Sequence, residues 1–245
     1  QDTAGLEYLT ALTRLDLSDN DFSIINVSQN AELWALYLDS NQISNIDLSN
    51  NILLVELRLR ENELAEIDVS KNTELRLLYL SSNQISNIDV SSNVLLVDLR
   101  LSGNELTAID VSLNTQLTML SLGLNQIINI DVSSNILLKD LFLQINELIA
   151  IDVSQNTQLR SLFLNSNQIS NIDVNNNLML KDLWLSDNQL STIDVGLNTL
   201  LTKLDLDSNQ LSTLDVNSNV MLEELSVTKN QLSTLDVMCD DKHLY

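Results

Sequence analysis

Aspartate recurs every 21 residues along most of this chain, and carboxylates serve both acid–base catalysis and calcium binding. A serine lies two residues after many of them, as Ser49 does after Asp47, and its hydroxyl or the turn backbone can hydrogen-bond the carboxylate. The glycine-rich aspartate loops of calcium-binding β-solenoids do not occur. We therefore expect a structural column, with calcium between neighbouring aspartates as the alternative and no other cofactor. The column comprises Asp47, Asp68, Asp89, Asp110, Asp131, Asp152, Asp173, Asp194, Asp215 and Asp236, with Asn26 in the first position.

Other catalytic chemistry has few residues to use. The chain has one cysteine, Cys239, and one histidine, His243, so it forms no internal disulfide and no thiolate zinc cluster. The sequence contains no nucleophile elbow, zinc-protease helix, phosphate loop or dinucleotide fingerprint. We predict that the protein is not an enzyme and that His243 belongs to a terminal cap.

Aromatic and basic residues gather in a second set of positions that also recurs every 21 residues. Five of the nine aromatic residues fall in one column, and ten of the twelve basic residues lie in the segments around it. Exposed aromatic and arginine side chains dominate binding hot spots, although aromatic residues can also stack to stabilise neighbouring strands. Leu124 and Ile145 add apolar surface nearby. The residues that we predict to contact a ligand are Trp34, Tyr37, Arg58, Tyr79, Arg100, Met119, Phe142, Phe163 and Trp184.

The elements that position these columns are internal repeats. The pattern L-x-x-L-x-L-x-x-N, as in Leu33, Leu36, Leu38 and Asn41, occurs eleven times without an insertion. A similar pattern closes on a second asparagine, such as Asn51, within the same unit. Each 21-residue unit is therefore two nested half-repeats. The first asparagine series is Asn20, Asn41, Asn62, Asn83, Asn104, Asn125, Asn146, Asn167, Asn188, Asn209 and Asn230.

This periodicity predicts a solenoid. Segments such as Leu36-Tyr37-Leu38 alternate with period two, so the leucines point inward and the middle residue points outward. No segment leaves room for a normal helix, so we expect a flattened coil with parallel strands on both sides. With four glycines and no proline, we expect asparagine to provide the left-handed turn conformations. We assign residues 1–11 to an N-terminal cap, 12–237 to the array and 238–245 to a C-terminal cap.

The repeat L-x-x-L-x-L-x-x-N-Q-I/L-x-x-I/L-D-V/L-S-x-N, over Leu12 to Val237, resembles the leucine-rich repeat family. It is similar in particular to the 21-residue nested subclass of bacterial proteins called IRREKO. Many such relatives carry cysteine at the third inward strand position, where this chain has leucine or Val227. The resemblance implies a β-rich, right-handed coil stack with short strands on two faces and little or no helix. It also implies protein–protein or cell-surface recognition through the strand (concave) face.

The net charge and the lack of long apolar runs exclude some classes of partner. The net charge of −22 argues against nucleic acid and against an anionic membrane surface. No run of 18 apolar residues occurs, so we expect no membrane insertion. The opening residues lack the pattern of a signal peptide, and the resemblance implies a secreted or surface protein of bacteria. A protein partner is the leading hypothesis, with a carbohydrate on the same aromatic row and a purely architectural spacer as alternatives.

Overall fold

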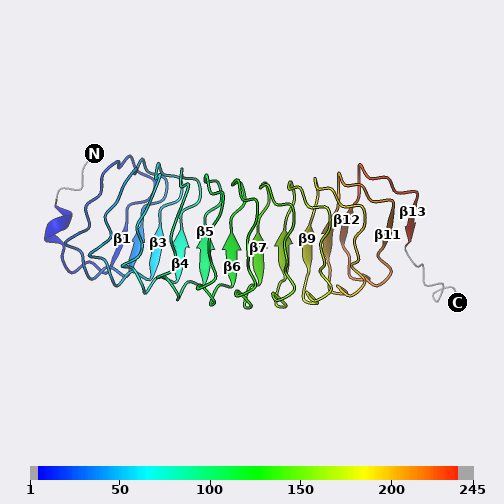
Figure 1. Ribbon diagram of the computed structural model, residues 1–245. Helices are drawn as coiled ribbons and strands as arrows, with labels where there is room; N and C mark the ends of the chain where they lie inside the picture. The colour runs from blue at the N-terminus through cyan, green and yellow to red at the C-terminus, as the bar shows by residue number, and fades with distance from the viewer. Residues whose placement is uncertain (1–4, 237–245) are drawn as a thin grey trace.

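The computed structural model describes residues 5–236, which form a rod of stacked coils (Figure 1). Its main feature is one parallel sheet of eleven short strands that runs along the rod. A short 3-10 helix, η1 (Leu6–Tyr8), stands at one end of this stack. The sheet contains β1 (Arg14–Asp16), β2 (Ala35–Tyr37), β3 (Glu56–Arg58), β4 (Leu77–Tyr79), β5 (Asp98–Arg100), β6 (Met119–Ser121), β7 (Asp140–Phe142), β8 (Ser161–Phe163), β9 (Asp182–Trp184), β10 (Lys203–Asp205) and β12 (Glu224–Ser226).

The strands pair in a register of 21 residues, so equivalent residues of neighbouring coils lie side by side. Leu36 pairs with Leu57, for example, and the flanking Tyr37 pairs with Arg58. Both leucines are fully buried, and with the isoleucines and valines of the other half-repeat they form one continuous core. A single coil could not bury these side chains, so the stack is stabilised by contacts between neighbours. The predicted coil stack with almost no helix is confirmed.

The second face of the rod is extended but carries fewer strand hydrogen bonds. Among residues 5–236 it forms a two-stranded sheet at one end, from β11 (Thr213–Asp215) and β13 (Thr234–Asp236). In the other coils, side-chain oxygens accept hydrogen bonds from backbone N–H groups that flank this segment. The N–H of Ile43 donates to Oδ1 of Asn62, and the N–H of Ser49 donates to Asp47. The expected strands of the second face are thus regular only near the end of the array.

The first asparagine series joins each coil to the one before it. The Nδ2 of Asn41 donates to the carbonyl of Leu38 at 3.1 Å and to that of Leu17, in the preceding coil, at 3.0 Å. Its Oδ1 accepts the N–H of Phe22, also in the preceding coil, at 3.0 Å. One buried amide therefore satisfies backbone groups in two coils and fixes their separation.

The second asparagine series is more deeply buried and binds through one end. Asn135 is fully buried, and its Nδ2 donates to the carbonyls of Val111 and Asn114, each at 3.0 Å. Its Oδ1 has no hydrogen-bond partner within the described part of the chain. The amide therefore acts as a double donor that holds the turn of the preceding coil.

The left-handed turn conformation falls on the residue before each asparagine of the first series, which corrects our expectation for asparagine itself. The asparagine side chain is engaged inside the coil, while the turn residue points to solvent. Ten non-glycine residues there have φ between 51° and 59°, a region that L-residues rarely adopt. Gly103 occupies the same column with φ 69°. The ten non-glycine residues are Asp19, Ser40, Glu61, Ser82, Leu124, Ile145, Ser166, Asp187, Ser208 and Lys229.

The N-terminal segment contacts the first coil through the same asparagine device. Asn30 donates to the carbonyls of Leu6 and Leu9 at 3.0 and 2.9 Å, so η1 covers the end of the stack. The cap assigned to 238–245, with Cys239 and His243, lies outside the described residues. The domain boundaries thus stay predictions. No helix within residues 5–236 is long and apolar enough to cross a membrane.

The asparagine column gives a direct test of what holds the coils together. Replacing Asn135 by alanine removes two buried hydrogen bonds, although each carbonyl keeps one backbone donor. We expect a loss of about 2 kcal/mol in the free energy of unfolding, about 1 kcal/mol per hydrogen bond, by urea denaturation. The exposed neighbour Ser134→Ala should change it by less than about 0.5 kcal/mol. Equal effects of the two substitutions would contradict this role.

Candidate functional site

The outward residues of the eleven-stranded sheet form one surface, which we call the first-strand face. Its central column contains seven of the predicted contact residues, and the strand register brings them into one line. The line has two different halves, separated by Ser121. Met119 lies in the adjacent column of the same face, and Trp34 precedes β2.

The N-terminal half is an alternating row of tyrosine and arginine, the Tyr–Arg ladder. The ring of Tyr37 has the guanidinium carbons of Arg14 and Arg58 at 4.8 and 4.5 Å from its centroid. The ring of Tyr79 has those of Arg58 and Arg100 at 5.3 and 4.7 Å. Arg60 lies further out, at 5.9 Å from the Tyr79 centroid. Each tyrosine is therefore flanked by at least two cations, which is a favourable cation–π arrangement.

Carboxylates of the neighbouring column lock this ladder. The Tyr37 hydroxyl donates to Glu56, and the Tyr79 hydroxyl donates to Asp98 at 2.8 Å. Asp98 also accepts two hydrogen bonds from Arg100, both at 2.9 Å. Burial, and then the hydrogen bond to Asp98, raise the pKa of Tyr79. Both rings are only 9% exposed, so the prediction that Tyr37 and Tyr79 offer aromatic surface to a ligand does not fit the structure.

The C-terminal half is a stacked aromatic row formed by Phe142, Phe163 and Trp184. The ring centroids of Phe142 and Phe163 are 4.7 Å apart at 46°, and those of Phe163 and Trp184 are 4.7 Å apart at 15°. All three side chains, and Met119, are half-buried, so their outer edges reach solvent. Trp34 is 42% exposed. It precedes β2 and so lies near the Tyr–Arg ladder, away from the stacked aromatic row.

An exposed apolar edge borders this half of the first-strand face. Leu124 and Ile145 occupy the left-handed turn column, where the neighbouring coils carry serine, aspartate, glutamate or glycine. Ile128 and Ile149 follow four residues later, in a column that otherwise holds serine, threonine or alanine. All four side chains are exposed. The sequence analysis missed Ile128 and Ile149, although their departure from the column was a visible signal.

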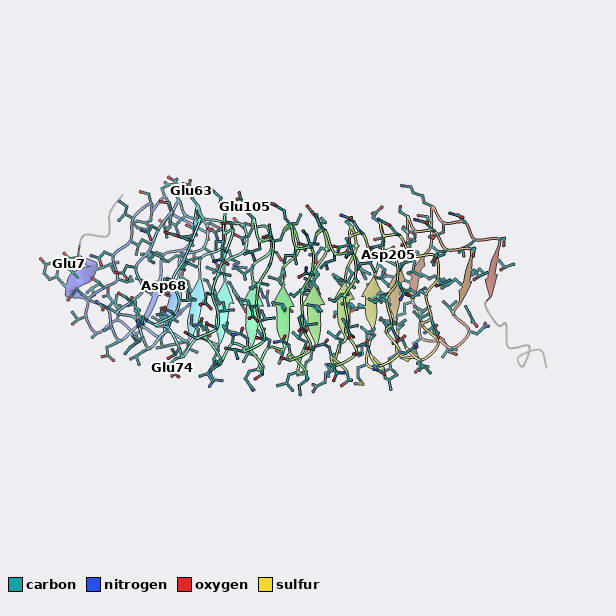
Figure 2. The ribbon with its side chains drawn as sticks, viewed as in Figure 1. Glu7, Glu63, Asp68, Glu74, Glu105 and Asp205 are labelled. Atoms are coloured by element: carbon teal, nitrogen blue, oxygen red, sulfur yellow. The ribbon has the colours of Figure 1, made fainter. Side chains whose placement is uncertain are left out.

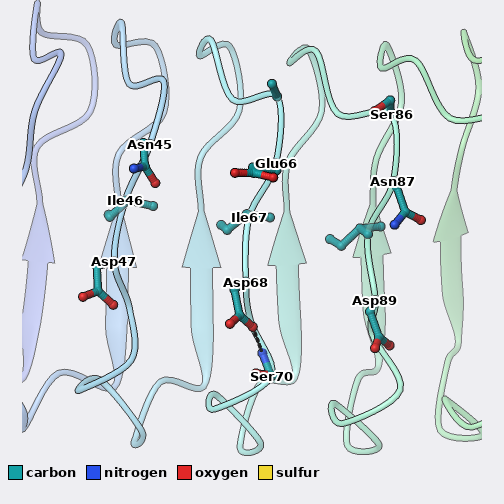
Figure 3. Close-up of a pocket in the computed structure, with 12 residues that line it drawn as sticks. Asn45, Ile46, Asp47, Glu66, Ile67, Asp68, Ser70, Ser86, Asn87 and Asp89 are labelled. Carbon is teal, nitrogen blue, oxygen red and sulfur yellow. Dashed lines mark hydrogen bonds between the residues drawn. The ribbon is translucent and has the colours of Figure 1, made fainter.

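The aspartate column lies on the second face, where each carboxylate closes a turn. Oδ1 of Asp68 accepts the N–H of Ser70 at 2.8 Å, and Asp47 and Asp89 occupy equivalent places in the adjacent coils (Figure 3). A groove of about 720 Å³ runs between these coils. Within residues 5–236 no group of three histidine, cysteine, aspartate or glutamate residues is arranged to hold a metal ion. The calcium alternative stays a prediction without a structural site.

Hydrogen bonds from the following serine lower the pKa of six of these aspartates. The backbone N–H is the larger cause for Asp47, Asp131 and Asp152, whereas the serine hydroxyl is the larger cause for Asp68, Asp89 and Asp110. These bonds outweigh burial and, where it acts, the repulsion between neighbouring aspartates, both of which raise the pKa. The column is therefore a row of turn caps.

Solved structures with the same fold include the functional domain of InlJ from Listeria monocytogenes, which includes a cysteine ladder. It has a TM-score of 0.95 and 34% identity over 96% of this chain and 53% of that domain. A leucine-rich repeat protein of Leptospira interrogans has a TM-score of 0.79 and 25% identity over 94% of this chain and 70% of that one. The leucine-rich repeats of FLRT2, in an octameric complex with latrophilin 3 and Unc5D, have a TM-score of 0.69 and 25% identity over 84% and 70%.

These likenesses, together with the repeat, show that the chain is a leucine-rich repeat protein. It spans about half of the InlJ domain, 53% of its length. Leucine stands at the third inward strand position in this chain, as at Leu38 and Leu59, so no cysteine ladder runs through the described repeats. No protein-family model matches the chain, and no curated protein matches it.

The Tyr–Arg ladder predicts that one arginine stabilises several coils. Replacing Arg58 by alanine removes the cation shared by two tyrosine rings, so we expect a loss of about 1.5 kcal/mol in the free energy of unfolding. Arg58→Lys keeps the charge but not the planar stack, so its free energy of unfolding should lie between those of the parent and of Arg58→Ala. Arg76→Ala, at an exposed position outside the ladder, is the control and should be nearly neutral. A loss at Arg76 as large as that at Arg58 would argue against the ladder.

The aspartate column predicts a specific sensitivity to acid. Because the folded-state pKa of these groups is lowered, their contribution to stability is present above the unfolded pKa of about 3.9 and is lost as pH falls through and below it. The variant Asp110→Asn/Asp131→Asn/Asp152→Asn should lose less stability between pH 5 and pH 3, measured by thermal melting. Asparagine keeps the turn acceptor, as Asn26 does with the N–H of Ser28 at 3.0 Å, but does not titrate there.

The control for this prediction removes the same number of charges elsewhere. Glutamates of the exposed column that includes Glu63 and Glu105 lie along one edge of the rod (Figure 2), and alternate coils carry glutamine in their place. The variant Glu63→Gln/Glu105→Gln/Glu147→Gln should keep the acid sensitivity of the parent. If both triple variants lose stability equally, general charge rather than turn capping is responsible.

Proposed function

We propose that this chain is a non-enzymatic recognition module that binds a protein partner through the C-terminal half of the first-strand face. The observation that carries the proposal is the difference between the two halves of one column. The Tyr–Arg ladder is closed by its own hydrogen bonds, whereas the edges of Phe142, Phe163 and Trp184 remain open to solvent. A stacked, partly exposed aromatic cluster is the usual centre of a binding hot spot.

The surroundings of the stacked aromatic row support this proposal. Lys139, Arg160 and Lys181 form a basic column three residues before it, beyond the intervening column of Asp140, Ser161 and Asp182, in a chain whose net charge is −22. The exposed apolar edge, with Leu124 and Ile145, borders its other side. An apolar centre with a charged rim is the common anatomy of a protein interface.

A spacer is less well supported by the same residues. Ile145 is β-branched and exposed at φ 56°, a conformation that costs roughly 1–2 kcal/mol in an L-residue. The neighbouring coils show that serine or aspartate suffices there, so a merely architectural rod has no use for this strain. Local strain with exposed apolar side chains favours a contact surface.

A carbohydrate ligand is also less well supported. A sugar chain stacks on a row of open aromatic faces, but Phe163 is stacked between Phe142 and Trp184, so only the outer face of Trp184, at the end of the row, is left open. The arginines that favoured an acidic glycan, Arg58 and Arg100, are engaged with tyrosines and carboxylates of the ladder. The exposed ring edges are better suited to protein side chains.

The similar solved structures support a recognition module of this kind. The likeness to proteins of Listeria and Leptospira supports a bacterial protein that acts outside the cell or at its surface. The likeness to FLRT2 repeats within a multiprotein complex supports a protein partner. The unbroken spacing of 21 residues and the nested second asparagine support the IRREKO subclass. The described carboxylates are mostly exposed or engaged in turns and ladders, which supports a role without catalysis.

The test compares capture of partners by two triple variants. Phe142→Ala/Phe163→Ala/Trp184→Ala should abolish capture of proteins from host-cell and bacterial surface extracts, scored by mass spectrometry against the parent. The control Val94→Thr/Ile136→Thr/Leu178→Thr changes exposed apolar residues at a turn position where alternate coils carry threonine, and should capture the same proteins. Circular dichroism confirms that both variants fold. Unchanged capture by the folded aromatic variant would refute the proposal, and binding only on a glycan array would favour the carbohydrate alternative.

A further inference from the structure

The stacked aromatic row ends at a hollow, and we propose that this hollow binds the guanidinium group of an arginine side chain supplied by the protein partner. The inference rests on the proposed function for the identity of the partner but not for the existence of the site. We call it the Trp184 hollow. It is formed by Trp184 of β9 and residues of the two following coils.

The geometry leaves one aromatic face for a ligand. One face of Trp184 stacks on Phe163, while its other side borders the hollow, which encloses about 450 Å³. In the next strand Asp205 pairs with Trp184, and in the strand after that Ser226 pairs with Asp205. Both side chains are too short to cover the indole, so the surface is recessed beyond Trp184.

The Tyr–Arg ladder, in the same column, shows which group contacts an aromatic face from the adjacent coil. In the Tyr–Arg ladder, a guanidinium lies 4.5 to 5.3 Å from the ring centroid of a tyrosine in the adjacent coil. Carboxylates of the adjacent column hold these arginines, as Asp98 holds Arg100. At Trp184 the repeat places Asp205 where the ladder places an arginine. In the adjacent column, Lys203 stands where the ladder places a carboxylate such as Asp98. The open aromatic face thus has a carboxylate beside it, and within residues 5–236 no guanidinium lies over Trp184.

The charge of the hollow matches such a cation. Four carboxylates and one ammonium group line it. The ammonium group, Lys203, is paired with Glu224 at 2.8 Å. Asp207 is occupied by the hydroxyl of Ser226 at 2.7 Å and the N–H of Thr228 at 2.5 Å. Asp205, which is labelled near the C-terminal end of the sheet in Figure 2, accepts the N–H of Asp207 through Oδ1 at 3.1 Å. Its second oxygen and the exposed Glu223 remain to face a ligand.

Hydrogen bonds displace the pKa of Asp207 and that of Lys203, which both line the hollow. Burial raises the pKa of Asp207, but the hydrogen bonds from Ser226 and Thr228 outweigh it and lower the pKa overall. The hydrogen bond from Lys203 to Glu224 raises the pKa of the lysine, so this ammonium group stays charged. A cation entering the hollow therefore meets excess negative charge next to an aromatic plane.

Arginine fits these features better than lysine does. A planar guanidinium stacks on an indole ring and presents several N–H donors in its own plane to flanking carboxylates. An ammonium group is more strongly hydrated and offers no plane to stack. The partner is therefore expected to present an exposed arginine next to apolar side chains that contact the stacked aromatic row.

The test uses a small probe and the whole chain. N-acetyl-arginine amide is titrated into ¹⁵N-labelled protein, and the indole N–H signals of Trp184 and Trp34 are followed by NMR. We expect a saturable shift of the Trp184 signal with a Kd on the order of millimolar, and little change at Trp34. N-acetyl-citrulline amide has nearly the same shape without the charge and should give no saturable shift, while N-acetyl-lysine amide should bind more weakly.

Two double variants locate the site. Asp205→Asn/Glu223→Gln should weaken arginine binding by about fivefold or more, because it removes the two available carboxylates but not the indole. Asp173→Asn/Asp194→Asn removes the same charge from the second face, where asparagine can keep the turn bonds to Asn175 and Gly196, and should bind like the parent.

The outcomes separate this inference from the proposed function. Equal shifts with citrulline, no saturable shift with arginine, or equal weakening by both double variants would overturn the Trp184 hollow as an arginine site. A protein partner captured through the aromatic row would then still support the proposed function. Arginine binding without any captured protein would instead support the site and refute the proposed function.

Discussion

The buried asparagine side chains are the interaction on which the rest of the structure depends. After Asn20, which bonds only its own coil, the amides of the first series bond backbone groups of their own coil and of the preceding one, as Asn41 does, and so fix the 21-residue register. A hydrophobic column of leucine and isoleucine could slide, because apolar contacts are not directional. The amides cannot slide without leaving buried carbonyls and N–H groups unpaired. Every outward column, aromatic or acidic, inherits its alignment from this constraint.

Once the register is fixed, the surface can vary coil by coil with little effect on the core. The central column of the first-strand face uses this freedom in two ways. Residues such as Tyr79 and Arg100 close on one another and on Asp98, which makes that half self-sufficient. Phe163 and Trp184 stack without polar partners and leave ring edges open. One backbone thus carries a structural row and a candidate contact row in the same line.

The sequence was sufficient to predict what repeats. The inward leucines such as Leu57, the buried asparagines and the outward columns follow from period-two alternation within a 21-residue unit. It did not predict the left-handed residue before each asparagine, because that position accepts side chains as different as Glu61 and Ile145 and carries no compositional signal. The hydrogen bonds of the aspartate column were anticipated, since each donor lies two residues away.

Features that depend on side-chain packing between coils could not be read from spacing. Tyr37 and Tyr79 sit in an outward column, yet arginines from both neighbours cover them, and the side-chain conformations that achieve this have no sequence signature. The Trp184 hollow likewise arises because two short residues succeed the aromatic row in the next two coils, and no motif marks it. The contact surface that we propose therefore covers only one half of the face and includes Ile128 and Ile149.

The positions of the two tryptophans have a consequence for folding studies. Trp34 precedes β2 near one end of the rod and is 42% exposed, whereas Trp184 lies half-buried in β9 against Phe163. Stacked-repeat proteins gain stability mainly from nearest neighbours, so their ends can unravel separately. The two indoles differ in solvent exposure and in aromatic neighbours, so their fluorescence should report on opposite ends of the array. The chain thus carries two intrinsic optical reporters of whether it melts as one unit or from its termini inward.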